Sequence, residues 1–210
     1  MKVRKCGFGI EGETEKVIDE AVGIILSGGL VVYPTETVYG IGACAFDQVA
    51  IKKVYKAKER PFDMPLSIAV HDKAAVARIA VMTPNLEKLI DAFMPGPLTI
   101  ISNKTSAVPD IATSMSQKVG IRIPDHPIAL ELARRAGPII TTSANRHSHP
   151  DAVNVADAKR DLGDAVDLYI DCGCPASGKP STIIWLDGDA VEIVRQGEIT
   201  KEQVEDVLGR

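Results

Sequence analysis

Residues 30–40 read LVVYPTETVYG, a short apolar segment followed directly by a polar turn. The stretch from Leu30 to Tyr33 is apolar and rich in β-branched residues, which is typical of a buried strand, and Pro34 ends it. The preceding segment, from Thr14 to Ser27, repeats apolar residues at helical spacing and is followed by two glycines. An amphipathic helix that leads into a buried strand predicts an α/β fold.

Helices and strands are expected to alternate along the rest of the chain. Asp47 is a suitable N-cap for a helix that runs towards Lys58. Because the last three expected strands have little helix between them, we predict a twisted mixed parallel and antiparallel sheet with flanking helices. With no internal repeat or linker, we expect a single domain over residues 1–210. Further helices are expected at 72–80, 84–93, 127–136, 155–162 and 200–208, and further strands at 66–70, 98–102, 119–123, 138–142, 168–171, 182–186 and 191–194.

Composition narrows the class of protein. The net charge of −4 argues against a surface built as a whole to hold nucleic acid, so any site for a polyanion must be a local basic patch. The N-terminus has no apolar run after its basic residues, and no later segment approaches the ~18 apolar residues that a membrane span needs. We therefore expect a cytoplasmic protein with no membrane partner.

The cysteines are expected to be reduced. Cys6, Cys44, Cys172 and Cys174 are too few for a disulfide scaffold, and they lack the two separated pairs of a structural zinc site. We interpret Cys172 and Cys174 as small core or turn residues rather than metal ligands, and we expect their joint replacement by Ser to leave folding largely intact.

Three polar clusters could carry chemistry, and each has a purely structural alternative. The turn Pro34–Gly40 joins hydroxyls and a carboxylate after a strand, but it could equally satisfy its own backbone. Lys58 and Arg60 end a run of five cations and could neutralise a triphosphate, or they could stabilise a helix C-terminus. Thr141 to Asn145, after another apolar strand, could hold ribose, phosphate or an amino-acid hydroxyl, or could form a cap.

A near-match to a P-loop is rejected. Gly173 to Lys179 reads G-x-x-x-x-G-K, but Pro180 occupies the position of the magnesium-binding hydroxyl, and 181–186 has the pattern of a strand rather than a helix. The four histidines show no metal-ligand spacing, although His147 and His149 lie close to Asn145 in the sequence.

Eight short segments in a fixed order resemble the YrdC-like family of threonylcarbamoyl-AMP synthases. The resemblance covers about residues 30–199. It implies a fold around a large electropositive cavity and the conversion of L-threonine, bicarbonate and ATP into threonylcarbamoyl-adenylate, pyrophosphate and water. It also implies Mg²⁺ with ATP, no resident metal, and a downstream transferase that modifies adenosine 37 of tRNA. The segments are PTETVYG from Pro34, KER from Lys58, PL from Pro65, PGPLT from Pro95, VGIRIPDHP from Val119, TSAN from Thr142, PST from Pro180 and RQGEI from Arg195.

The resemblance also implies roles for individual residues. Lys58 and Arg60 would carry catalysis by screening phosphate charge, and we expect both side chains to be solvent-accessible at the cavity wall. The ATP-binding set would be Lys58, Arg60, Ser143, Asn145 and Arg195, and the threonine-binding set Thr35, Ser67, Arg122, Thr141 and Ser181.

The sequence departs from the family pattern at two places. It has His147-Ser148 where the family often has Ser-Gly, which leaves the adenine side of the pocket unassigned. It also ends at Arg210 without the extra C-terminal domain of some relatives, so we expect any lid from that domain to be absent or replaced.

Two other functions remain open from the sequence. A non-catalytic module could grip double-stranded RNA or tRNA through the same basic concavity, whereas 4% aromatic residues disfavour a single-strand reader. A related carbamoyl-adenylate enzyme of hydrogenase maturation is the second alternative, but that protein needs acylphosphatase-like and zinc-finger regions that this sequence does not contain.

Overall fold

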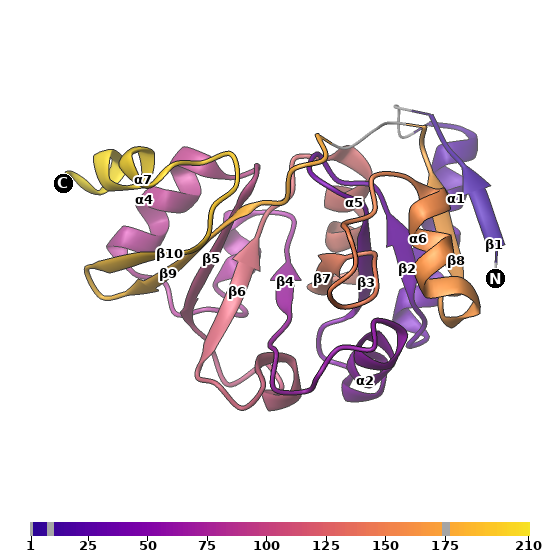
Figure 1. Ribbon diagram of the computed structural model, residues 1–210, viewed down its shortest axis with the longest axis horizontal. Coiled ribbons are helices and arrows are strands. Elements are labelled where there is room, and N and C mark those ends of the chain that lie inside the picture. The colour runs from indigo at the N-terminus through magenta and orange to yellow at the C-terminus, as the bar shows by residue number, and fades with distance from the viewer. Residues whose placement is uncertain (1, 8–10, 174–176) are drawn as a thin grey trace.

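One mixed sheet organises the fold (Figure 1). The computed structural model describes residues 2–7, 11–173 and 177–210. Neighbouring strands in this part of the chain include both parallel and antiparallel pairs, which confirms the predicted mixed sheet. From one edge to the other, the ten strands are β1 (Lys2–Lys5), β8 (Leu168–Asp171), β2 (Val31–Tyr33), β3 (Gly40–Cys44), β7 (Ile139–Ser143), β4 (Ser67–Ala69), β6 (Lys118–Arg122), β5 (Leu98–Asn103), β9 (Thr182–Asp187) and β10 (Ala190–Arg195).

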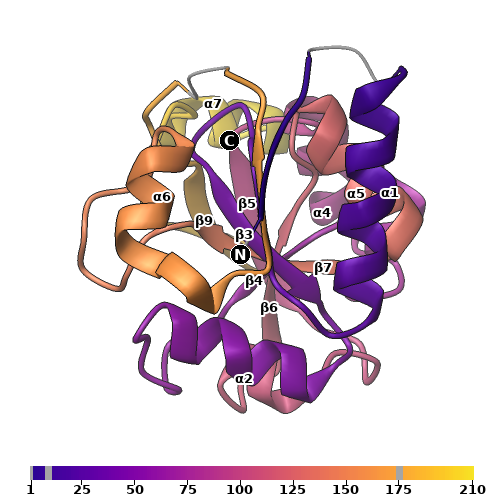
Figure 2. The same ribbon diagram turned by 90° about the vertical axis from the view of Figure 1, so that its right-hand side faces the viewer.

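Helices pack on both faces of the sheet. Figure 2 shows α1 (Glu13–Leu26), α4 (Pro84–Phe93) and α5 (Pro127–Ala136) on one side of the strands and α6 (Val155–Leu162) on the other. Asp47 caps α2 (Gln48–Ala57) as predicted, because its side chain accepts hydrogen bonds from the second and third backbone N–H groups that follow it. The remaining helices are the single-turn α3 (Lys73–Val76) and the C-terminal α7 (Lys201–Leu208), which packs against α4.

Three elements differ from the prediction. The edge strand β1 was not expected, because all four of its side chains are exposed and give no apolar signal. Strand β3 was missed because two of its five residues are glycines. The helix expected at 72–80 shortens to α3, and Ala80 instead forms an isolated antiparallel bridge with Lys104.

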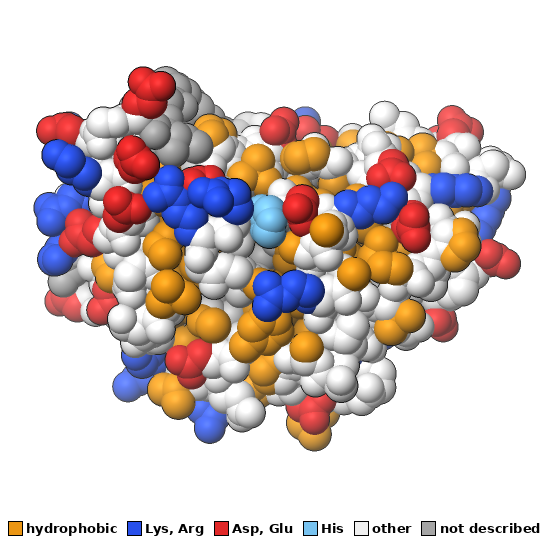
Figure 3. Space-filling model, turned by 180° about the vertical axis from the view of Figure 1, so that it is seen from behind, with side chains coloured by type: hydrophobic (Ala, Val, Ile, Leu, Met, Phe, Trp, Pro, Cys, Tyr) orange, Lys and Arg blue, Asp and Glu red, His pale blue; other side chains and the backbone are white. Residues whose placement is uncertain are grey.

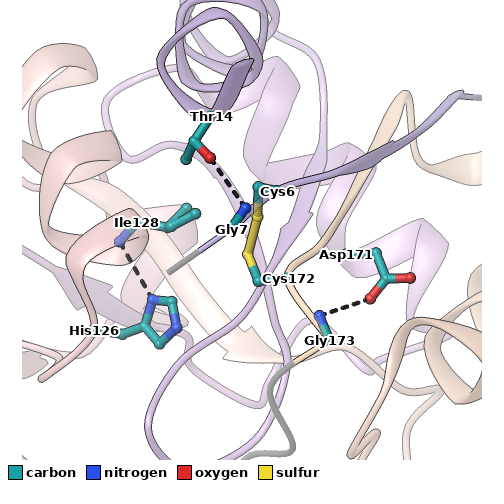
Figure 4. The surroundings of a disulfide bond; sticks show 8 residues. All are labelled: Cys6, Gly7, Thr14, His126, Ile128, Asp171, Cys172 and Gly173. Atoms are coloured by element: carbon teal, nitrogen blue, oxygen red, sulfur yellow. Dashed lines mark hydrogen bonds between the residues drawn. A yellow bond between two sulfur atoms is a disulfide. The ribbon is translucent and has the colours of Figure 1, made fainter. Parts of the chain in front are cut away.

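The cysteine prediction is wrong for one pair, because Cys6 and Cys172 form a disulfide (Figure 4). The parallel register pairs Lys5 of β1 with Asp171 of β8. The residues that follow them, Cys6 and Cys172, therefore lie side by side. The cysteines are 166 residues apart, and only the unpredicted β1 brings them together. Cys172 is therefore a cross-link rather than a free core residue, Cys44 is a free thiol, and Cys174 lies outside the described residues.

Candidate functional site

A cavity of about 420 Å³ opens on one face of the sheet. Strand β6 shows how it forms: Lys118, Gly120 and Arg122 line the cavity, whereas Val119 and Ile121 between them are buried in the apolar core. Alternate side chains of a strand point to opposite faces of the sheet, so one strand contributes both to the cavity and to the apolar core. Four cations line the cavity, Arg60, Lys118, Arg122 and Arg195, and the described residues of its lining include no carboxylate.

Small residues keep the centre of the cavity open. Ser67 of β4 is paired with Gly120 on one side and with Thr141 on the other. A Cβ atom at Gly120 would lie 2.5 Å from the Ser67 Oγ atom, closer than packing allows, so glycine at this position leaves room for the Ser67 hydroxyl. The structure thus brings together Ser67 and Thr141, both assigned to the threonine pocket from the sequence.

Thr141 is oriented from behind by Tyr33. The buried Tyr33 hydroxyl lies 3.0 Å from Thr141 Oγ1 and donates a hydrogen bond to it. Burial raises the pKa of Tyr33 to about 12, so the phenol stays protonated and remains a donor. Gly40 and Gly42 accommodate its ring, since added Cβ atoms would lie 3.3 Å and 2.8 Å from ring atoms.

Arg122 lies at the end of β6 and is held by the Pro34–Gly40 turn. Its Nη2 atom donates to Glu36 Oε1 at 2.9 Å and to Thr37 Oγ1 at 2.7 Å. Its side chain is only 9% exposed, so this ion pair is largely removed from water. Glu36 Oε2 and Arg122 Nε are buried and have no hydrogen-bond partner.

The hydroxyl of Thr35 is already satisfied within the same turn. It donates to Val38 O at 2.6 Å and lies 3.0 Å from Thr37 Oγ1. It also accepts a bond from the Thr37 backbone N–H. Thr35 lines the cavity as the sequence assignment requires, but its hydroxyl has no spare donor or acceptor for a ligand.

Lys58 differs from the expectation of an accessible side chain at the cavity wall. It is 2% exposed, it does not line the cavity, and its ammonium points away into backbone oxygens. Nζ donates to Ser143 O, to Asn145 O at 2.6 Å and, at 3.4 Å, to Asn145 Oδ1. Burial, followed by repulsion from Arg60, lowers the pKa of Lys58 from 10.5 to about 7. Lys58 therefore braces the segment after β7 from behind.

Arg60 does reach the cavity. Its Nε and Nη2 atoms donate to Met64 O at 3.1 Å and Pro65 O at 2.9 Å, bonds that set the curve of the loop before β4. Burial lowers the pKa of Arg60, but a guanidinium stays protonated in proteins. Arg60 therefore contributes a permanent positive charge to the cavity wall.

The segment after β7 is fixed by contacts behind the cavity. Ser143 lines the cavity, whereas Asn145 is 5% exposed and donates from Nδ2 to His149 O at 2.6 Å. His149 Nδ1 in turn lies 3.2 Å from Asp161 Oδ2 on α6. Ser148, at the position where the family pattern often has glycine, adopts a φ of 66°, a conformation that glycine takes more easily.

Arg195 and Ser181 form the opposite wall. Arg195 donates from Nε and Nη2 to Ser181 O at 3.1 Å and 2.9 Å, while the Ser181 hydroxyl lies 2.9 Å from Thr99 Oγ1. The turn after β10 approaches closely at Gly197, where a Cβ atom would lie 2.4 Å from the Thr182 backbone nitrogen. This close approach explains the glycine in the RQGEI segment.

Eight of the ten residues assigned from the sequence line one cavity, and Lys58 and Asn145 lie behind it. One end of the cavity was not predicted from the sequence; there the Lys118 ammonium lies 5.6 Å from the centre of the Trp185 ring. The signal was the alternation within β9, since Ile183 and Trp185 line the cavity while Ile184 is buried in the core.

The described residues support the rejection of the P-loop. Thr182–Asp187 is a strand, as predicted, so no helix follows the glycine-containing segment to receive a phosphate. Residues 174–176 lie outside the described part of the chain. Within the described ranges, no group of three or more His, Cys, Asp or Glu side chains could hold a metal ion.

Comparison with protein-family models assigns the chain. Residues 23–197 match the Sua5_yciO_yrdC family, whose model is described as "Telomere recombination". The chain belongs to the Sua5/YciO/YrdC family. A relative from Methanocaldococcus jannaschii, provisionally named a threonylcarbamoyl-AMP synthase, is 41% identical over 90% of this chain and 89% of its own length. The Bacillus subtilis threonylcarbamoyl-AMP synthase is 37% identical, and the match covers 91% of this chain and 56% of that protein.

Solved structures of the family have the same architecture. The crystal structure of P. abyssi Sua5 complexed with L-threonine matches with a TM-score of 0.93 at 34% identity, covering 100% of this chain and 61% of that one. The chain thus spans about three-fifths of that relative. The crystal structure of E. coli YciO matches with a TM-score of 0.84 at 25% identity, and the match covers 93% of this chain and 95% of that one. HypF, at 18% identity, shares the fold alone.

Proposed function

We propose that this family member is a threonylcarbamoyl-AMP synthase, which joins L-threonine, bicarbonate and ATP into threonylcarbamoyl-adenylate and pyrophosphate. The observation that carries the proposal is one cavity in which Arg122 lies among hydroxyl side chains together with two further arginines, Arg60 and Arg195. Relatives named for this activity and a threonine-bound Sua5 structure support it.

The threonine end of the cavity would be organised around Arg122. A guanidinium suits the carboxylate of an amino acid, and hydroxyls suit its polar side chain. Ser67, Thr141 and Ser181 surround the remaining space, while Thr35 forms the wall beside them. Because the Thr35 hydroxyl is saturated, we expect it to shape the pocket rather than to bond the substrate.

The nucleotide end would be formed by Arg60, Ser143 and Arg195. Both arginines bond neutral oxygens within the protein, so their charges remain free to attract phosphates. Lys58 would support the segment that carries Ser143 and Asn145 through its hydrogen bonds to their backbone carbonyls. No carboxylate lines the described part of the cavity, so Mg²⁺ is expected to enter with the nucleotide rather than to bind a site prepared by the protein.

The chemistry needs charge screening and positioning rather than a covalent nucleophile. The threonine ammonium first loses one proton. Its neutral amine nitrogen then bonds to the carbon of bicarbonate, a second N–H hydrogen joins the departing hydroxide as water, and a carbamate remains. A carbamate oxygen then attacks the α-phosphorus of ATP, and the bond to pyrophosphate breaks. Both reactants of this step are anions. Fixed cations such as Arg60 and Arg195 would lower their repulsion and stabilise the leaving group.

An RNA-binding module without catalysis is the alternative. Figure 3 shows one face of the molecule, on which basic and acidic side chains are interspersed rather than gathered into a basic surface. A site for an RNA backbone would need cations spread along a groove, whereas Arg60, Arg122 and Arg195 converge on one cavity. We therefore favour the enzyme, with tRNA modified by a separate transferase.

Pyrophosphate release tests the proposal. We expect release from ATP to require threonine, bicarbonate and Mg²⁺ together, with each omission abolishing it. Serine, which lacks only the methyl group, should be used about 10- to 200-fold less efficiently in kcat/KM. Equal rates with threonine, serine and alanine would contradict the choice of amino acid. RNA binding with no amino-acid-dependent pyrophosphate release would favour the alternative.

A further inference from the structure

Among the four described cations that line the cavity, Arg122 alone forms a salt bridge with a largely buried carboxylate, that of Glu36. Glu36 Oε1 accepts from its Nη2 atom at 2.9 Å, and the Glu36 side chain is itself only 19% exposed. Lys118 also has a carboxylate partner, Asp187, but that side chain is 63% exposed and lies in solvent. Arg60 and Arg195 bond neutral oxygens. The buried ion pair therefore sets Arg122 apart from its neighbours.

The hydrogen positions around Arg122 can be assigned from the contacts. The Thr35 hydroxyl donates to Val38 O, so in its 3.0 Å contact with Thr37 it must accept. The Thr37 hydroxyl therefore donates to Thr35 and accepts from Arg122 Nη2 at 2.7 Å, since a guanidinium can only donate. A single directed chain runs from Arg122 through Thr37 and Thr35 to a backbone carbonyl.

The two bonds use both hydrogens of Nη2. One goes to Glu36 and the other to Thr37, so Nη2 has none left for a ligand. Nε is buried without a partner and has no access to solvent. Nη1 makes no hydrogen bond to the described residues and is not one of the buried atoms that lack a partner. Because Arg122 lines the cavity, Nη1 is the nitrogen left for a ligand.

We propose that Glu36 and Thr37 are positioning residues that hold Arg122 by Nη2 and reserve its Nη1 atom for the carboxylate of the amino-acid substrate. This inference rests on the proposed function. A two-pronged grip on phosphate would need a second nitrogen beside Nη1, and Nη2 is occupied. The negative charge of Glu36 also makes Arg122 less attractive to a polyanion than Arg60 or Arg195. The pair thus separates the amino-acid end of the cavity from the triphosphate end.

Thr37→Val tests the orienting hydroxyl at nearly constant side-chain volume. Because the lost bond is to a charged group, we expect the Kd and KM for L-threonine to rise about 10- to 100-fold. The KM for ATP should stay within about twofold, since Arg60 and Arg195 are untouched. Thr37→Ser, which keeps the hydroxyl, should restore most of the affinity. Thr105→Val removes a hydroxyl that bonds Arg78 O outside the cavity and is the matched control, with both KM values unchanged.

Glu36→Gln tests the charge separately from the geometry. The amide oxygen can still accept from Nη2, but Arg122 is no longer neutralised. We expect pyrophosphate, which should not compete with threonine in the wild-type protein, to become a competitive inhibitor against it in the variant. Melting temperatures of all variants show whether each protein is folded, and the Glu36→Gln measurement stands if Thr37→Val does not fold.

Separate outcomes distinguish failure of this inference from failure of the proposed function. Threonine binding measured by calorimetry that Thr37→Val leaves unchanged, or equal rises in the KM for threonine and for ATP, would overturn the positioning role alone. Unchanged inhibition by pyrophosphate in Glu36→Gln would overturn the role of the charge. No threonine binding by the wild-type protein would overturn the proposed function and this inference with it.

Discussion

Replacing Lys58 with Met removes an ammonium from the interior and keeps most of the side-chain volume. Nζ donates to two backbone carbonyls, of Ser143 and Asn145, that bring the end of β7 to the cavity. Each buried acceptor left without a donor costs about 1–3 kcal/mol. Relief of the burial of a charge acts in the opposite direction. We therefore expect Lys58→Met to lower the free energy of unfolding by about 2–4 kcal/mol near neutral pH.

The matched control is Lys56→Met in the last turn of α2, two residues before Lys58. Lys56 is exposed, so its replacement should change the free energy of unfolding by less than about 0.5 kcal/mol. Urea denaturation followed by circular dichroism measures both. A Lys58→Met protein as stable as wild type but without turnover would show that Lys58 contacts the nucleotide rather than bracing the backbone.

The pH dependence of the same pair gives a second readout. Burial lowers the pKa of Lys58 from 10.5 to about 7, so between these values the unfolded chain binds more protons than the folded protein. Stability rises with pH wherever the unfolded state binds more protons. The stability of wild type relative to Lys58→Met should therefore increase from about pH 7 towards pH 10.5, and a constant difference across this range would contradict the burial of the ammonium.

Three further predictions follow from other parts of the structure. Arg60→Ala should reduce turnover by about 100-fold or more with little change in melting temperature, and full pyrophosphate release by this variant would remove Arg60 from the site. Cys6→Ser should lower the free energy of unfolding by about 2–4 kcal/mol and abolish the sensitivity of the melting temperature to dithiothreitol. A wild-type melting temperature that dithiothreitol does not change would show that Cys6 and Cys172 are not bonded. Gly42→Ala should displace the Tyr33 ring, because the added Cβ atom would lie 2.8 Å from a ring atom, and should raise the KM for threonine more than the KM for ATP. An unchanged KM for threonine would contradict the role of Tyr33 in orienting Thr141.

Local sequence patterns predicted most of the fold because the signals were strong where packing is regular. Helix α1 repeats buried residues at helical spacing, and Asp47 caps α2 with two hydrogen bonds. Strand β1 gave no signal, because KVRK has no buried side chain and is defined only by its pairing with β8. The disulfide could not be foreseen without that pairing.

The sequence predicted which residues belong to the site, but it did not predict the directions in which their side chains point. Strand ends and turns with clustered hydroxyls and cations indicated the residues that line the cavity. Lys58 and Arg60 lie two apart in one cationic run, yet one is 2% exposed and points to backbone carbonyls, while the other reaches the cavity. That difference depends on Ser143 and Asn145, which lie more than eighty residues further along the chain. Local charge patterning holds no information about such a contact.

No helix in the described part of the chain is long and apolar enough to cross a bilayer. The substrates proposed for this cavity all carry anionic groups, a carboxylate, bicarbonate or phosphates, and the arginines that line it are the groups expected to hold them.

Mass spectrometry of the product tests whether this cavity makes a carbamoyl-adenylate from threonine. The protein is incubated with ATP, L-threonine, Mg²⁺ and ¹³C-bicarbonate, and the nucleotide products are separated at once. We predict threonylcarbamoyl-adenylate carrying one ¹³C atom, in an amount equal to the pyrophosphate released. AMP or ADP as the only nucleotide products, or an adenylate without the isotope, would contradict the account.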